Sequence, residues 1–362
     1  MDSSPTPDLV ALAQSVAAPQ HGPRPLPLFL GILWRETAHD PDLRRRAFVG
    51  LRRYQEAQRP SAPPPAPAIA QVGQARLLRY GVDNERSPVI FVPSLINPPQ
   101  VLDLAQHSSM LRHMAAAGHD AMLVDWGAPS RQNADMDLSG HVTDRLIPLI
   151  ATLPRPPILV GYCLGGTLSL AAAMLRTVAG LATIAAPWQF DGFATSDRAE
   201  IATLWQEAKP VCERLGYMPM EVLQSGFWAM DPARTIRKYA AFADMADGSD
   251  AARAFMAVED WANAGPPLTY AAARELFEQL YAANASGQGM WTVGGTGVDP
   301  AALTCPTLSI RSTTDRIVPA AAAPDLAEDW RFPLGHVGMI VSGRARETLW
   351  TPLSQWLCSH GG

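Results

Sequence analysis

The stretch PILVGYCLGGTLSL, residues 157–170, places a cysteine between two short apolar runs. Its centre, GYCLGG at positions 161–166, has the spacing G-x-C-x-G-G. This spacing is typical of a nucleophile elbow, a sharp turn from a strand into a helix that raises one side chain above the edge of a sheet. Glycine suits the flanking positions because strand and helix approach closely there and the turn requires unusual backbone angles. We therefore expect a strand, then Cys163 at the turn, then a helix.

Short apolar runs and helical patterns alternate on both sides of this turn. Residues 109–118, for example, have the pattern of a helix that ends at Gly118. The runs that read as strands lie within SPVIFVP (87–93), HDAMLVD (119–125), PPILVGY (156–162), GLATIAAP (180–187) and CPTLSIRS (305–312). Strands that alternate with helices form mostly parallel sheets with helices on both faces. The sequence therefore predicts an α/β fold.

The chain divides by pattern into three parts. Residues 1–70 contain an amphipathic helical stretch and end in the proline-rich segment RPSAPPPAPAIA (59–70), which cannot continue a helix. Residues 71–187 and 301–362 carry the alternation of strands and helices and form the predicted α/β core. Residues 188–300 break this alternation and read as several helices rich in Trp, Phe and Met. We interpret that block as a helical cap inserted into the core.

Charge and cysteine content limit the classes of function. The formal net charge of -5 argues against nucleic acid as a partner. The four cysteines show neither a C-x-x-C pair nor the spacing of a zinc site, so we expect reduced thiols and no metal. Cysteine outside such an elbow is most often a buried packing residue, the role that we assign to Cys212, Cys305 and Cys358.

The sequence also bears on where the protein resides. Its first residues, MDSS, lack the basic region and the apolar run of a signal peptide. The apolar stretch 164–187 is interrupted by Arg176 and divides into a helix and a strand, which is not the pattern of a membrane span. We therefore expect a cytoplasmic protein.

A nucleophile elbow requires an acid and then a histidine later in the chain, each in a loop after a strand. Asp315 follows the run LSI (308–310), and His336 lies between small residues in PLGHVGM, 336 − 315 = 21 residues further on. Both residues have the expected order and loop context. Asp125 also ends a predicted strand, but it precedes Cys163, and we interpret it as a structural or pocket residue.

Each candidate has a physical role in such a site. The Cys163 thiolate would be the nucleophile, and His336 would take its proton. Asp315 would fix the imidazole tautomer and offset its charge when the ring is protonated. The oxyanion hole would be formed by the backbone N–H groups of Leu164 and of either Ile96 or Leu95.

Several segments, taken together with the elbow, resemble the polyhydroxyalkanoate synthases, members of the α/β-hydrolase superfamily, and among them the short, two-subunit type. They are FVPSLINPPQVLDL (91–104), LVDWGAP (123–129), VEDWANAGPPLTYAAARELFEQLYAAN (258–284), DRIVP (315–319) and FPLGHVGMIVSGRA (332–345). The resemblance implies an α/β-hydrolase fold with a mostly parallel sheet. It also implies that Cys163, Asp315 and His336 are the nucleophile, acid and base. One departure is Arg316, which stands where the family usually has a histidine after the acid.

The resemblance further implies an activity and a set of partners. The enzyme would be an acyltransferase that polymerises 3-hydroxyacyl groups from coenzyme A thioesters through an acyl-enzyme on Cys163, releasing coenzyme A. The thioester would be its substrate, with no other cofactor. A second synthase subunit, a second copy of the chain and the surface of a polymer granule would be its partners. The alternative is hydrolysis by the same three residues, as an acyl-CoA thioesterase or an intracellular polyester depolymerase.

Overall fold

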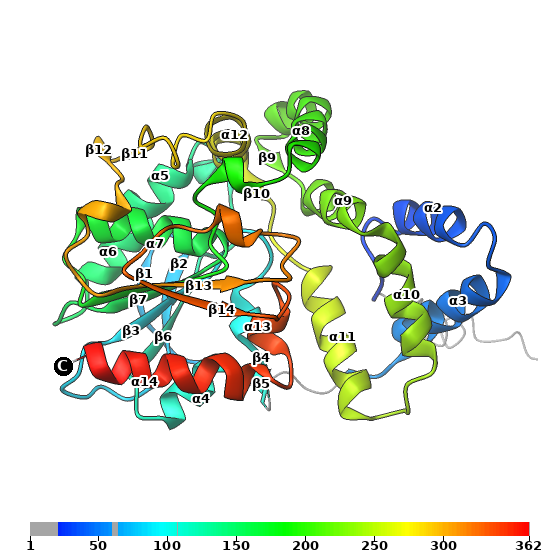
Figure 1. Ribbon diagram of the computed structural model, residues 1–362, viewed down its shortest axis with the longest axis horizontal. Coiled ribbons are helices and arrows are strands. Elements are labelled where there is room, and N and C mark those ends of the chain that lie inside the picture. The colour runs from blue at the N-terminus through cyan, green and yellow to red at the C-terminus, as the bar shows by residue number, and fades with distance from the viewer. Residues whose placement is uncertain (1–20, 60–63, 107, 362) are drawn as a thin grey trace, which may run out of the picture. The chain divides into compact units, whose positions relative to one another are not determined.

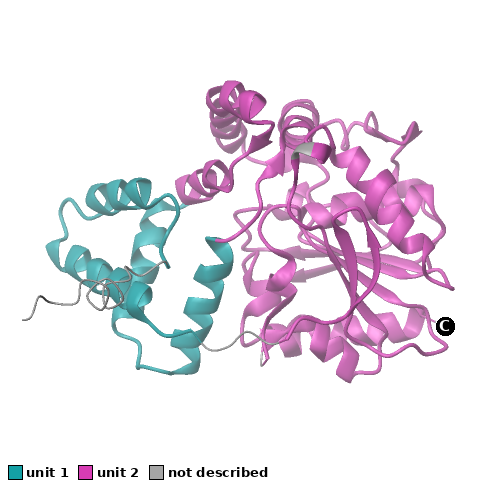
Figure 2. Ribbon diagram, turned by 180° about the vertical axis from the view of Figure 1, so that it is seen from behind, with its two compact units in different colours: residues 1–60, 231–263 teal, residues 61–230, 264–362 magenta. Residues whose placement is uncertain are grey.

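A computed structural model describes residues 21–59, 64–106 and 108–361. The chain forms two compact units, coloured separately in Figure 2. Unit 1 comprises Met1–Pro60 and Asp231–Asn263, and unit 2 comprises Ser61–Met230 and Ala264–Gly362. The part of the predicted N-terminal helical segment that precedes residue 21 lies outside the described residues.

Unit 2 is built on an eight-stranded sheet with the order β1-β2-β6-β3-β7-β8-β13-β14 (Figure 1). Its strands are β1 (Ala68–Val72), β2 (Ala75–Arg79), β3 (Val89–Val92), β6 (Ala121–Asp125), β7 (Ile158–Tyr162), β8 (Gly180–Ile184), β13 (Thr307–Ser312) and β14 (Glu328–Phe332). The pairs β1–β2 and β2–β6 are antiparallel, and every other pair is parallel. This order and these directions are those of the α/β-hydrolase fold, so the predicted fold class is confirmed.

The central strands are apolar because helices cover both faces of the sheet. Every residue of β3, β6, β7 and β8 is buried, as expected for parallel strands between two helical layers. Figure 1 shows α4 and α14 on one face and α6 and α7 on the other. The helices of this core are α4 (Met110–Ala116), α5 (Leu138–His141), α6 (Ile147–Ala151), α7 (Leu164–Leu175), α13 (Gly338–Val341) and α14 (Thr351–His360).

Shorter elements complete unit 2. Three ribbons of two strands are formed by β4 (Asp103–Ala105) with β5 (Ser108–Ser109), β9 (Tyr217–Met218) with β10 (Leu268–Thr269), and β11 (Thr292–Val293) with β12 (Thr296–Gly297). The 3-10 and π-helical segments are η1 (Pro99–Leu102), η2 (Arg131–Asn133), η3 (Val142–Leu146), η4 (Phe190–Gly192), η5 (Glu275–Ala282), η6 (Pro300–Ala302), η7 (Ala320–Ala322) and η8 (Arg346–Trp350). Across the described ranges, every helix is too short or too polar to span a bilayer.

The predicted linker and cap need two corrections. Strand β1 begins at Ala68, inside the segment 59–70, because the prolines end at Pro67 and a turn at Gly73 (φ 60°) lets the chain pair with β2. The predicted cap, residues 188–300, is divided between the two units, since 231–263 pack with the N-terminal helices. The cap elements that remain in unit 2 include α8 (Thr195–Leu215), α9 (Met220–Met230), α12 (Tyr270–Arg274) and η5.

The described part of unit 1 contains four helices around an aromatic core. They are α2 (Leu26–Glu36), α3 (Pro41–Glu56), α10 (Pro232–Ala243) and α11 (Asp250–Ala262). Tyr239 lies at the centre of this core, with ring centroids 4.9 Å from Phe29, 5.8 Å from Tyr54 and 5.4 Å from Phe255. At Gly50, α3 passes so close to α10 that an added Cβ would lie 1.8 Å from the Tyr239 carbonyl oxygen.

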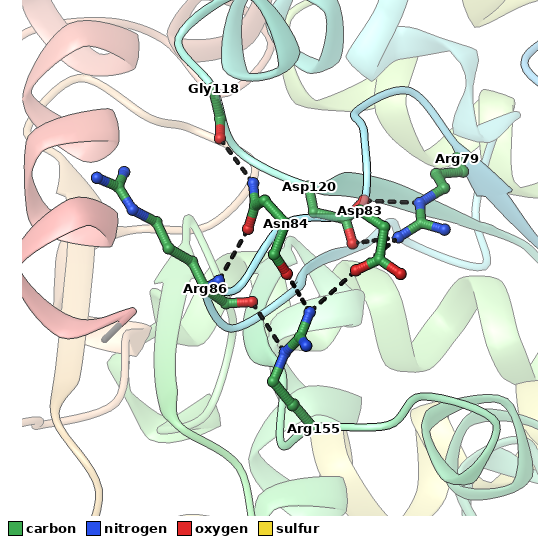
Figure 3. Close-up of polar contacts among 7 residues, drawn as sticks. All are labelled: Arg79, Asp83, Asn84, Arg86, Gly118, Asp120 and Arg155. Atoms are coloured by element: carbon green, nitrogen blue, oxygen red, sulfur yellow. Dashed lines mark hydrogen bonds and ion pairs between the residues drawn. The ribbon is translucent and has the colours of Figure 1, made fainter.

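A network of hydrogen bonds and ion pairs lies at the amino ends of the central strands of unit 2 (Figure 3). The Arg79 guanidinium binds both oxygens of buried Asp120, at 2.8 and 2.6 Å, just before β6. Arg155, just before β7, contacts Asp83 at 3.0 Å and the backbone oxygens of Asn84 and Arg86. These contacts hold the loop that leads into β3. The opposite edge, where the parallel strands end, carries the candidate site.

Candidate active site

The sequence around Cys163 folds as the elbow that its spacing predicts. Cys163 follows β7 directly and precedes the first residue of α7, with φ 53° and ψ −131°. A positive φ is rare outside glycine and stores strain, so the neighbouring bonds must hold the turn. The Cys163 N–H donates to the Ile184 carbonyl at 2.9 Å, and its own carbonyl accepts from Gly166 N at 2.8 Å.

The glycines around Cys163 are required by close packing. A Cβ on Gly165 would lie 2.1 Å from the Val92 carbonyl oxygen, at the end of β3. A Cβ on Gly161 would lie 2.4 Å from the Gly166 Cα, so strand and helix could not approach as they do. The motif therefore presses the start of α7 against the ends of β3 and β7 and fixes where the thiol emerges.

The structure brings Asp315 and His336 together, although 21 residues separate them. Asp315 follows β13, and His336 follows β14, the neighbouring strand at the edge of the sheet. Nδ1 of His336 donates to Oδ2 of Asp315 at 2.6 Å. The other carboxylate oxygen, Oδ1, accepts from Ile317 N at 2.7 Å and from Val318 N at 3.0 Å. Since both side chains are buried, these bonds fix the carboxylate and orient the ring.

Cys163 and His336 are coupled by charge. Burial of the imidazole lowers the pKa of His336, but the charge of a Cys163 thiolate and the hydrogen bonds to Asp315 and Cys163 raise this pKa to about 10. A negative charge on Cys163 therefore stabilises the protonated form of the His336 ring.

The two backbone groups assigned to an oxyanion hole lie in different settings. Leu164 is the first residue of α7, so its N–H has no acceptor within the helix and can donate to a ligand. Ile96 lies in the loop after β3, and its N–H donates to the Ser94 hydroxyl at 3.0 Å. A ligand would have to compete with Ser94 for that group. The role of Ile96 stays a prediction, with Leu95 as the alternative.

Two tyrosines near the candidate site were not predicted from the sequence. The Tyr162 ring lies 5.2 Å from the His336 ring, and its hydroxyl donates to the His336 carbonyl at 3.4 Å. Burial, together with the charges of Cys163 and Asp315, raises the pKa of Tyr162. Burial and the charge of Cys163 likewise raise the pKa of Tyr281 on η5. Tyr162 directly precedes the nucleophile, a position that could have drawn attention to it.

The remaining sequence candidates lie in other environments. Asp125 pairs with Arg76 at 2.5 Å and accepts from Gly127 N at 3.0 Å, which confirms its interpretation as a structural or pocket residue. Burial raises the pKa of Cys212 and of Cys305, so neither thiol ionises readily. Cys358 is exposed, which contradicts its assignment as a buried packing residue, because it lies on the outer side of the last helix. Within the described ranges, no group of three or more His, Cys, Asp or Glu side chains could hold a metal ion.

The chain is similar in sequence to polymerase subunits from several organisms. It is 27% identical to the poly(3-hydroxyalkanoate) polymerase subunit PhaC of Thiocystis violacea. The match covers 81% of this chain and 88% of that subunit. The chain is 29% identical over 82% of its length to the PhaC subunit of Haloferax mediterranei and spans 64% of that longer protein. The PhaC subunit of a Synechocystis strain is 27% identical over 92% of this chain and 95% of its own length.

Solved structures of lower sequence identity are also similar to this chain. A thermophilic esterase from Thermogutta terrifontis has a TM-score of 0.49 and 17% identity, over 84% of this chain and 100% of its own. A monoacylglycerol lipase from Paleococcus ferrophilus has a TM-score of 0.47 and 14% identity, over 79% of this chain and 99% of its own. No protein-family model matches the sequence.

Proposed function

We propose that this chain, which is similar in sequence to poly(3-hydroxyalkanoate) polymerase subunits, is a polyhydroxyalkanoate synthase of the α/β-hydrolase superfamily and polymerises 3-hydroxyacyl groups taken from coenzyme A thioesters. One observation carries the proposal: a chain related to polymerases over 81% of its length has a cysteine, paired with a histidine, at the elbow. A thiol suits thioester exchange because donor and acyl-enzyme are thioesters of similar energy, whereas a serine ester would be a poorer acyl donor.

In the first step, the Cys163 thiolate attacks the carbonyl carbon of the substrate. The oxyanion that forms would accept hydrogen bonds from Leu164 N and one N–H of the β3 loop. When the bond from carbon to coenzyme A breaks, the His336 imidazolium gives its proton to the departing thiolate. The products are free coenzyme A and a hydroxyacyl thioester on Cys163.

In the second step, a hydroxyl group attacks the acyl-enzyme. His336, now neutral, takes the hydroxyl proton, and Asp315 stabilises the imidazolium that results. The new oxygen ester forms as the bond from the acyl carbon to the Cys163 sulfur breaks. The thiolate and imidazolium pair is then restored, and the polyester is one unit longer.

The test is to incubate the purified protein with 3-hydroxybutyryl-CoA and to measure coenzyme A, monomeric acid and oligomer separately. We expect coenzyme A to exceed free acid severalfold, with the difference recovered as ester-linked oligomer. Cys163→Ala should abolish coenzyme A release, while the control Cys212→Ala should retain it. Acid released mole for mole with coenzyme A would instead establish the alternative, a thioesterase. Undiminished release by Cys163→Ala would exclude this thiol as the nucleophile.

A further inference from the structure

A cavity of about 380 Å³ lies in unit 2 at the carboxyl ends of β3 and β6. We call it the β3 cavity. Its walls come from β2, from the loops after β3 and β6, from α5 and from residues 265–269. The last segment lies close over the β3 loop, since a Cβ on Gly265 would be 3.3 Å from the Asn97 Cα. Because β3 is also the neighbour of β7, which leads to Cys163, the cavity is one strand away from the elbow.

A buried histidine presents an acceptor to this cavity. His141, on α5, is 7% exposed and lines the cavity, and its ring lies 5.8 Å from the Trp126 ring. Its Nδ1 is 2.6 Å from the Asp137 carbonyl oxygen and must donate to it. Burial lowers the pKa of His141, so the ring is neutral and Nε2 carries a lone pair. Among the described residues, no donor contacts Nε2.

A guanidinium supplies donors in the same cavity. Arg76 on β2 lines it and binds Oδ2 of Asp125 through Nη2 at 2.5 Å, while its side chain stays 48% exposed. Within the described part of the chain, its other N–H groups have no acceptor. Asp125 is satisfied by Arg76 and by Gly127 N. The pair is therefore neutral as a whole, which favours an uncharged ligand. Its remaining N–H donors favour a ligand that carries a carbonyl oxygen.

We propose that the β3 cavity binds the neutral ester of a short hydroxy acid, with the ligand hydroxyl donating to His141 Nε2 and the ester carbonyl accepting from Arg76. A volume of about 380 Å³ lies within the range of small-ligand sites. The choice of a hydroxy ester rests on the proposed function, in which such a group ends the growing chain. The cavity would then hold a hydroxyacyl unit beside the acyl-enzyme.

The proposal is tested by binding, without turnover. The full-length protein with Cys163→Ala is titrated with methyl 3-hydroxybutyrate, methyl butyrate and the 3-hydroxybutyrate anion, and the indole N–H signal of Trp126 is followed by NMR. We expect the hydroxy ester to bind roughly three- to tenfold more tightly than methyl butyrate, the effect of one hydrogen bond. The anion should bind more weakly than the ester. The comparison of the three ligands requires no substitution in the cavity, so it can be made even if a cavity variant fails to fold.

A second arm adds His141→Phe, which keeps an aromatic ring against Trp126. In this variant the affinity for the hydroxy ester should fall to that for methyl butyrate. His360→Phe is the matched control, because His360 has the same local geometry, with Nδ1 2.9 Å from the carbonyl oxygen four residues earlier. Equal binding of the two esters, tighter binding of the anion, or no shift at Trp126 would each overturn the proposal. None of these outcomes depends on whether Cys163 polymerises its substrate.

Discussion

At Cys163 and His336, the protonation of one side chain depends on the charge of the other. The raised pKa of His336 arises from the thiolate and from Asp315, against the effect of burial. A serine at this turn would supply no such charge to the histidine, because its hydroxyl stays protonated until substrate arrives.

We predict that His336 titrates near pH 10 in the folded protein and that its pKa falls in Cys163→Ala, since the thiolate charge is removed. Between its ordinary pKa of 6.5 and its folded-state pKa of about 10, the folded protein keeps a proton on His336 that the unfolded chain releases, and this stabilises the folded state. The stabilisation is complete below pH 6.5 and disappears as pH rises through about 10. NMR of labelled histidine measures the titration, and Cys212→Ala is the control. A pKa of His336 that is unchanged in Cys163→Ala would contradict the coupling.

Asp315 should matter more for elongation than for acylation. A thiolate already paired with an imidazolium needs little further help, whereas a hydroxyl must lose its proton during the attack. In Asp315→Asn we expect elongation to fall by about 10²–10⁴-fold, the range of a general-base contribution, and acylation to fall less. Mass spectrometry of the trapped acyl-enzyme measures the first step, and oligomer yield measures the second. Equal, small losses at both steps would exclude this role.

At the scale of elements, the junction of β3, β7 and α7 sets the geometry of the site. The Gly165→Ala substitution should lower the free energy of unfolding by about 3 kcal/mol or more, because its Cβ would lie 2.1 Å from the Val92 carbonyl oxygen. Gly343→Ala is the control, since nothing lies within 4 Å of a Cβ at that position. Denaturant titration compares the two variants. A Gly165→Ala protein as stable as Gly343→Ala would show that the junction adjusts at low cost.

The central elements could be predicted from the sequence because burial on both sides of a sheet demands apolar runs. β3, β6, β7 and β8 contain such runs, and the positions of Asp315 and His336 followed from strands that end before them. Strand β1 escaped prediction for the opposite reason. It lies at the sheet edge, no residue in it is fully buried, and prolines precede it. Nothing in its pattern distinguishes it from a linker.

The division of the cap escaped prediction for a different physical reason. Helices α10 and α11 have clear apolar faces, with Ile236, Tyr239 and Met256 among their buried residues. Periodicity indicates that such a face is covered but not which segment covers it. Here α2 and α3 cover it from almost 200 residues earlier in the chain. Pairings over such separations leave no local signal.

At the scale of the whole molecule, unit 1 is assembled from two distant segments. Removal of residues 1–59 should expose the apolar faces of α10 and α11, which pack against Phe29 and Tyr54 in the intact unit. We expect the truncated protein to bind more of a hydrophobic dye and to be cleaved faster within 231–263, while unit 2 keeps its own sheet. Limited proteolysis with mass spectrometry locates the cuts. Unchanged protection of 231–263 would show that α10 and α11 are stable without α2 and α3.

The proposed polymerisation would require that water stay away from the acyl-enzyme while a hydroxyl reaches it. We expect the aromatic side chains of the cap in unit 2 to contribute to this exclusion. Phe193 is 5% exposed, with ring centroids 5.7 Å from Phe190 and 5.2 Å from Tyr281, and the charge of Cys163 acts on Tyr281. Removing the Phe193 ring leaves a void beside Tyr281 that water can fill.

We therefore predict that Phe193→Ala raises the ratio of free acid to coenzyme A severalfold with 3-hydroxybutyryl-CoA, because water then competes with the hydroxyl for the acyl-enzyme. Acylation should change less, since the ring contacts of Phe193 are with Phe190 and Tyr281. Phe48→Ala, at an exposed phenylalanine of unit 1, is the control and should leave the ratio unchanged. If both variants give the ratio of the unmodified protein, the aromatic cluster only packs the cap, and water must be excluded by other means.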